Sequence, residues 1–141
     1  MPLVFPMSFC HAGSVPNTST WNPADKNASV TLSNSNYTAA SSASSQLARS
    51  VTSHATGKWY AEFNIDAVGT ASLGIATSGM SLSSGYVGST ALGWGDYAGG
   101  QYLNTGSNNG AGTPPGYTSN DIIMVAFDAD AGKLWLSLIH I

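Results

Sequence analysis

Residues 57–67 alternate between apolar and polar side chains, and this pattern constrains the fold more than any other feature of the chain. The apolar positions are Trp59, Ala61, Phe63, Ile65 and Ala67, and the positions between them are Lys58, Tyr60, Glu62, Asn64 and Asp66. Successive side chains of a β-strand point to opposite faces of the sheet. The segment is therefore predicted to be a strand with one face on the core and the other in water.

Weaker patterns predict further strands at residues 29–33 and 37–39 (a hairpin), 46–52, 71–77, 121–128 and from 133 onward. Residues 122–127 are apolar on both faces, which indicates a central buried strand. We expect Leu47 and Val51 to point inward, and Gly74 to mark a bulge or a close backbone approach. Residues 14–23 and 104–120 are predicted to be loops, and residues 128–132 a turn. No segment has the pattern of a helix of normal length.

The composition agrees with an all-β domain and excludes several functions. Only 11 of the 141 residues are charged, whereas Ser, Thr, Gly and Asn together number 59. With a formal net charge of −3, the chain lacks the basic surface that binds nucleic acid or an anionic membrane. The single cysteine, Cys10, cannot form an internal disulfide, so the core must stabilise the domain.

The sequence contains few arrangements of residues that suit catalysis. Glu62 and Asp66 lie on the polar face of one strand, about 13 Å apart by the rise per residue. Glycosidase carboxylates are closer, at roughly 5 to 9.5 Å, so solvation is the preferred interpretation of this pair. His54 follows Ser53, but the Gly-x-Ser-x-Gly elbow of many serine hydrolases is absent from the sequence.

Metal and cofactor motifs are weak as well. Cys10 and His11 are adjacent, but no second pair of ligands follows at zinc spacing. Asp128 and Asp130 resemble the start of a calcium loop, but the later acidic ligands are missing, which favours a turn. The sequence therefore predicts no metal site, no cofactor and no catalytic residue.

Four segments in order carry a family resemblance. They are GKWYAE at residues 57–62, LGIA at 73–76, LG at 92–93 and NDIIMVAFDADAGKLW at 120–135. Together they resemble the SPRY domain, and the lead-in at residues 21–26 is similar to that of SPRY domains in phage and bacterial proteins. Asn120 and Met124 depart from the family pattern, which usually has Gly at both positions. Neither change puts the fold in doubt.

The resemblance implies a two-sheet antiparallel β-sandwich of the concanavalin A-like jelly-roll kind, with no general enzymatic activity. Such domains bind partners through loops at one edge, so we expect a recognition or structural module that binds a protein or a surface glycan. A phage tail, virion or bacterial cell surface is the expected location. A lectin-like carbohydrate-binding module is the alternative. A glycoside hydrolase is a third interpretation, which requires two carboxylates facing one cleft.

The expected binding loops are residues 80–86, 94–102 and 104–117, which are rich in Gly and aromatic residues. Exposed aromatic rings beside amides and carboxylates suit the recognition of peptides or sugars, although half or more of them could be core residues. The candidate binding residues are Tyr86, Trp94, Asp96, Tyr97, Tyr102, Asn104 and Tyr117.

The two ends of the chain are expected to lie outside the domain. Residues 1–20 are predicted to be a leader or linker, and residues 21–135 the SPRY-like sandwich. Residues 136–141 are what a transposase end sequence used in sequencing libraries encodes when read in frame. We therefore expect native sequence to about Trp135, a domain that lacks its final strand or strands, and no function for His140. The alternative is an ordinary apolar strand.

Overall fold

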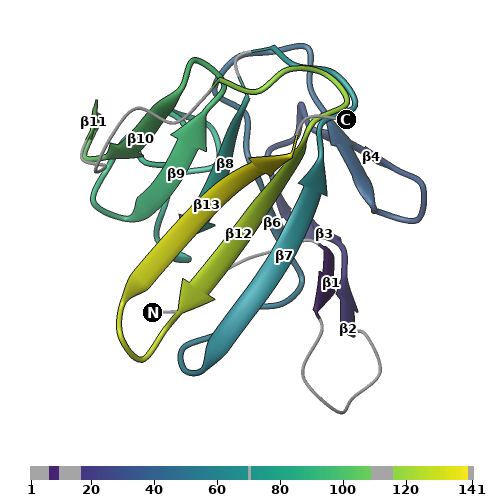
Figure 1. Cartoon of the computed structure of the whole chain (residues 1–141). Helices are drawn as coiled ribbons and strands as arrows, with labels where there is room; N and C mark the ends of the chain where they lie inside the picture. Colours follow the sequence, from purple (N-terminus) through teal and green to yellow (C-terminus); the bar gives the residue numbers. More distant parts are fainter. Residues whose placement is uncertain (1–6, 10–16, 70, 109–115, 140–141) are drawn as a thin grey trace.

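The structure is a computed structural model that describes residues 7–9, 17–69, 71–108 and 116–139 (Figure 1). The described residues contain no helix, and every strand pair is antiparallel, so the predicted all-β class is confirmed. The strands are β1 (Met7–Phe9), β2 (Asn17–Ser19), β3 (Trp21–Lys26), β4 (Thr31–Ser33), β5 (Thr38–Ala40), β6 (Ala48–Ser50), β7 (Lys58–Asn64), β8 (Ser72–Ala76), β9 (Gly93–Tyr97), β10 (Gln101–Asn104), β11 (Ser107–Asn108), β12 (Ile122–Asp128) and β13 (Lys133–Ile139). None of the described residues belongs to a helix able to cross a membrane.

The largest strands form a three-stranded sheet in the order β13-β12-β7. The predicted alternation in β7 is confirmed, because Ala61 and Phe63 are buried whereas Lys58, Glu62 and Asn64 are exposed. β12 is the central strand, as predicted, and its residues Ile123, Val125 and Phe127 face the core. The turn between β12 and β13 is also confirmed: the backbone N–H of Ala131 donates to Asp128 Oδ1 at 2.9 Å.

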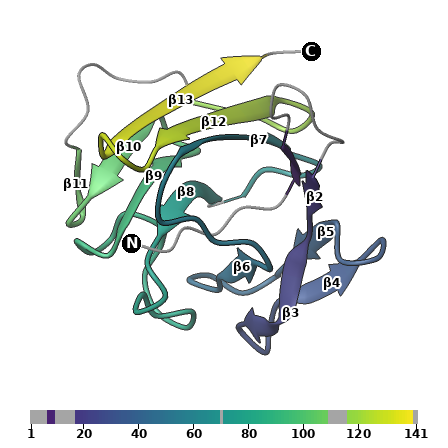
Figure 2. The same ribbon diagram turned by 90° about the horizontal axis from the view of Figure 1, so that it is seen from below.

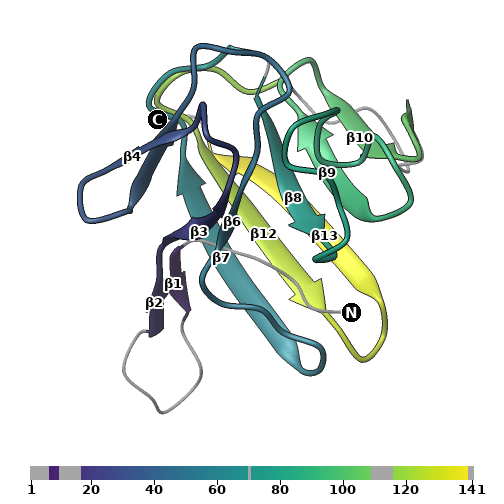
Figure 3. The same cartoon turned by 180° about the vertical axis from the view of Figure 1, so that it is seen from behind.

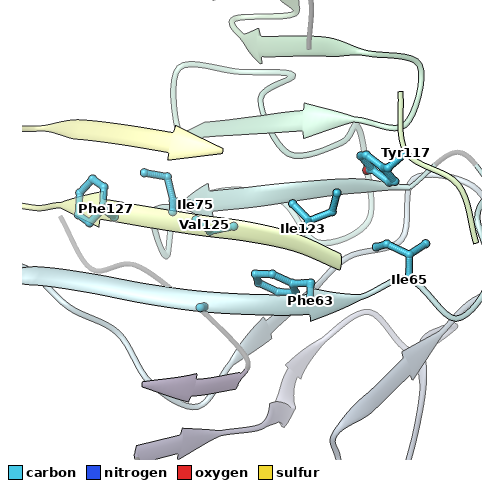
Figure 4. Packing of buried hydrophobic residues seen from close by; sticks show 8 residues of the cluster. Phe63, Ile65, Ile75, Tyr117, Ile123, Val125 and Phe127 are labelled. Atoms are coloured by element: carbon cyan, nitrogen blue, oxygen red, sulfur yellow. The ribbon is translucent and has the colours of Figure 1, made fainter. Parts of the chain in front are cut away.

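A second sheet, in the order β11-β10-β9-β8, lies against the first. Figure 2 shows β7, β12 and β13 as one layer, with β8, β9 and β10 beneath it on one side and the short strands β3 to β6 on the other. The apolar cluster between these layers consists of Ala61, Phe63, Ile65, Ile75, Tyr117, Ile123, Val125 and Phe127 (Figure 4). The two layers agree with a β-sandwich.

The short strands β3 to β6 complete the fold behind the first sheet (Figure 3). The predicted hairpin is confirmed as β4 and β5, joined by a turn in which Asn34, Ser35 and Asn36 have φ values of 51°, 54° and 68°. Two expectations for this region are wrong. The chain is extended from Trp21, where a loop to residue 23 was predicted, because β3 pairs with β6. Val51 lies beyond β6 and is 54% exposed instead of pointing inward.

Candidate functional site

The predicted binding residues lie on and around the sheet formed by β8, β9 and β10. Residues 94–102, predicted to be a loop, are a hairpin of β9 and β10 instead. Sequence reasoning missed these strands because glycine at positions 93, 95, 99 and 100 removes the alternating pattern. A further strand, β11, lies within the predicted loop 104–120, of which residues 109–115 fall outside the described part of the chain.

The two faces of β9 have different neighbours. Trp94 and Asp96 are opposite Ile75 and Leu73 of β8, and Trp94 packs against the core between the sheets. The other face meets the loop at residues 77–92. A Cβ at Gly93 would lie 2.9 Å from Met80 Sδ, and one at Gly95 would lie 2.8 Å from Val87 Cγ1. Glycine at both positions therefore lets this loop pack directly on the strand.

Polar contacts fix the loop at several points. The buried Arg49 side chain donates to Asp25 Oδ1 at 2.8 Å and to the Met80 carbonyl. The backbone N–H of Val87 donates to Ser72 Oγ at 3.1 Å, and that of Gly106 donates to the Gly88 carbonyl at 2.9 Å. These bonds join the loop to three separate parts of the chain, so it is held in one position on the sheet.

Tyr86 and Tyr97 meet on this loop-covered side. Their ring centroids are 6.1 Å apart and the rings are tilted by 44°, which is a favourable geometry for an aromatic pair. Both side chains are partly exposed. Of the predicted binding aromatics whose side chains the structure describes, these two are brought together at the surface.

Asn104 supports this surface from the end of β10, and Tyr102 lies two residues before it on the same strand. The Asn104 amide Nδ2 donates to the Gly93 carbonyl at 2.7 Å, which joins the end of β10 to the start of β9. Tyr102 is opposite Asp96 in the β9–β10 pair, but its side chain lies outside the described part of the structure. Asn104 therefore positions the backbone beneath the loop.

Tyr117 is a core residue, as the alternative interpretation of the aromatics allows. Its side chain is 2% exposed, so a partner at the surface cannot contact the ring. The hydroxyl donates to the Ala71 carbonyl at 2.8 Å and lies 3.4 Å from the Asp96 carbonyl. Burial, followed by the charge of Asp96, raises the pKa of Tyr117 above its usual range.

We predict that Tyr117→Phe lowers the free energy of unfolding by about 1 kcal/mol, because the Ala71 carbonyl loses one of its two donors and keeps the backbone N–H of Ala98, while the ring still fills the core. Urea unfolding of the variant and the parent protein measures the difference. A neutral result would mean that water replaces the hydroxyl at Ala71.

Asp96 is the least expected residue of this region. Its side chain is 4% exposed and faces the core side of β9, and its Oδ1 atom has no hydrogen-bond partner among the described residues. Burial raises the pKa of Asp96 to about 6, although a hydrogen bond with the backbone of Tyr97 acts in the opposite direction. A carboxylate buried to this depth with one oxygen atom unpaired is destabilising, and the cost falls when the group binds a proton.

The remaining carboxylates have local partners. Glu62 Oε1 accepts from the Tyr60 hydroxyl at 2.6 Å, and Asp66 Oδ1 accepts from Asn64 Nδ2 at 2.7 Å. Asp121, Asp128 and Asp130 accept backbone N–H groups of Thr118, Ala131 and Gly57. The described residues contain no group of three or more His, Cys, Asp or Glu side chains that could hold a metal ion.

His54 packs against an aromatic side chain. Its ring stacks on Trp59 with centroids 3.2 Å apart and the planes 12° from parallel, and burial lowers the pKa of His54. Cys10 and His11, the other histidine motif of the sequence, lie outside the described residues.

Comparison of the sequence with protein families and curated sequences identifies no relative. No model of a protein family matches the chain, and no curated protein sequence matches it.

Proposed function

We propose that the chain is a non-enzymatic recognition module of the SPRY type, which binds a protein partner through the surface formed by Tyr86, Tyr97 and the loop at residues 77–92. The observation that carries the proposal is the way this loop is held. Gly93 and Gly95 let it lie directly on β9, and Arg49 fixes it through Met80. A loop held in place before binding loses little entropy when a partner docks.

Two further observations support the SPRY interpretation. The four segments that resemble the family lie in neighbouring strands of the two sheets, namely β7, β8, β9 and the β12–β13 hairpin. Their antiparallel arrangement is the one that the resemblance implies. The lead-in at residues 21–26 suits a phage tail or bacterial surface protein, and we include a virion or cell surface in the proposal as its location.

A protein partner suits the composition of this surface. Tyr86 and Tyr97 offer amphipathic rings with few rotamers to immobilise, and such residues often dominate binding energy at protein interfaces. Leu92, at the end of the same loop, is 41% exposed and adds apolar area.

A selection of random peptides on the immobilised full chain tests the proposal. Enriched peptides are expected to bind the parent protein, and Tyr86→Ala is expected to weaken them about tenfold, the usual effect of removing a central aromatic anchor. Leu92→Ser provides a second variant of the surface, and Tyr60→Ala, on the other sheet, is the matched control. Thermal melting verifies that each variant is folded. Enriched peptides that bind Tyr86→Ala and Leu92→Ser as well as they bind the parent would contradict the proposal.

A further inference from the structure

The outer face of the β13-β12-β7 sheet is a second surface with aromatic side chains, opposite the core. Lys58, Glu62 and Asn64 of β7 are exposed on it, and so are Lys133, Trp135, Ser137 and Ile139 of β13. Figure 2 draws no strand above this face. Trp135 is 54% exposed, an unusual position for the side chain that gains most from burial.

Strand register aligns three of these positions. Ala126 of β12 is opposite Tyr60 on one side and Trp135 on the other. We call Tyr60, Ala126 and Trp135 the outer aromatic row. Neighbouring strands lie about 4.8 Å apart, so the two aromatic residues are about 10 Å apart across the row, measured between their Cα atoms. Side chains stand roughly perpendicular to a sheet, and the small Ala126 leaves space between the rings.

A hydrogen bond fixes the Tyr60 side chain at one end of the row. The Tyr60 hydroxyl donates to Glu62 Oε1 at 2.6 Å. Burial, followed by this bond and the charge of Glu62, raises the pKa of Tyr60 to about 12, so the phenol remains a donor at neutral pH. Glu62 is exposed, and a carboxylate can accept more than one hydrogen bond. The row therefore has a fixed hydrogen-bonding group beside its rings.

Charges of both signs surround the row and offset one another. The Nζ atom of Lys58 lies 3.6 Å from Asp128 Oδ2, and Asp128 is opposite Lys133 in the strand pair. With Glu62, the face therefore has two positive and two negative side chains. A ligand with a large charge of either sign would meet an unfavourable group here. The backbone of β12 is paired with β7 and β13 on both sides, so a peptide lying across the row cannot form hydrogen bonds with the backbone beneath it. A ligand must bind by stacking and by side-chain hydrogen bonds.

From these observations we propose that the outer aromatic row binds a neutral glycan, with one pyranose ring stacked on Trp135 and enclosed on the other side by Tyr60. The C–H face of a sugar packs on an aromatic ring, and its hydroxyls are donors for Glu62 and acceptors for Lys133. This binding site goes beyond the proposed function, because it uses the sheet opposite the Tyr86 surface and a different class of ligand.

Calorimetric titration with neutral hexasaccharides of glucose, N-acetylglucosamine, galactose and mannose tests the proposal on the full chain. At least one is expected to bind saturably. Trp135→Ala is expected to weaken it at least about tenfold, the loss of one well-packed aromatic contact, and Trp135→Phe to weaken it less. Ala126→Leu, which keeps an apolar side chain but fills the space between the rings, is expected to abolish binding.

Tyr86→Ala is the matched control and is expected to bind the same hexasaccharide with unchanged affinity. This control separates the two proposals, because a failure of peptide binding at Tyr86 leaves the sugar titration unaffected. The glycan proposal is overturned if none of the four hexasaccharides binds, or if the binding persists in Trp135→Ala. It is also overturned if sedimentation reveals a dimer of the parent chain that Trp135→Ala dissociates, since the row would then be an interface between two copies.

Discussion

Replacement of Gly74 by alanine is expected to lower the free energy of unfolding by about 3 kcal/mol or more, and Tm by about 10 °C. A Cβ at this position would overlap the Trp94 carbonyl oxygen and lie 2.5 Å from the Cα of Gly95. Both atoms belong to the backbone of β9, which is paired with β8. They can move away only by breaking the ladder that joins the two strands, so we expect a large effect from one methyl group.

Gly69→Ala is the matched control, because a Cβ at Gly69 meets no atom of the described residues within 4 Å. Urea and thermal unfolding, followed by tryptophan fluorescence, should place this control within about 0.5 kcal/mol of the parent, as for most surface substitutions. If the two alanine variants were equally stable, β8 and β9 would not approach as closely as the structure indicates.

The sequence predicts strands well where large apolar side chains mark them, by alternation in β7 and by a continuous run in β12. Both strands lie where expected, and β13 begins at Lys133, as expected. The pattern fails in β9 and β10. Gly93 and Gly95 have no side chains to record which face they occupy, and they are glycine because Met80 and Val87 occupy that space. The missing side chains at Gly93 and Gly95 therefore have two effects. They hide β9 from sequence analysis, and they let the loop pack on the strand.

The candidate sites were predictable only in part. The sequence made Tyr86 and Tyr97 candidate binding residues, but it could not separate them from Tyr117, which lies in the core. The outer aromatic row was missed because it depends on the register between three strands. Period-two alternation assigns Tyr60 and Trp135 each to an outer face, but only the pairing of both with Ala126 aligns them. The one signal in the sequence was that Tyr60 and Trp135 both alternate with the apolar residues of their strands that face the core.

Asp96 was predicted as a surface contact, since carboxylates are rarely buried without a partner. Its burial gives the protein an unusual dependence on pH. The pKa of an aspartate is 3.8 when unperturbed and rises to about 6 in the folded protein, so the folded state binds more protons in this interval. The contribution of Asp96 to stability is therefore highest below the lower value and declines as pH increases towards the upper one.

We expect Asp96→Asn to gain about 2 kcal/mol of stability relative to the parent between about pH 4 and pH 7, because asparagine carries no charge to bury. Urea unfolding of both proteins across this range measures the change in their difference, which is independent of any constant effect of the substitution. Asp128→Asn provides a control of opposite sign. A hydrogen bond from Ala131 lowers the pKa of Asp128, so its contribution is lost as pH falls. A constant difference between Asp96→Asn and the parent would mean that water reaches the carboxylate and that the core beside Tyr117 is open at this point.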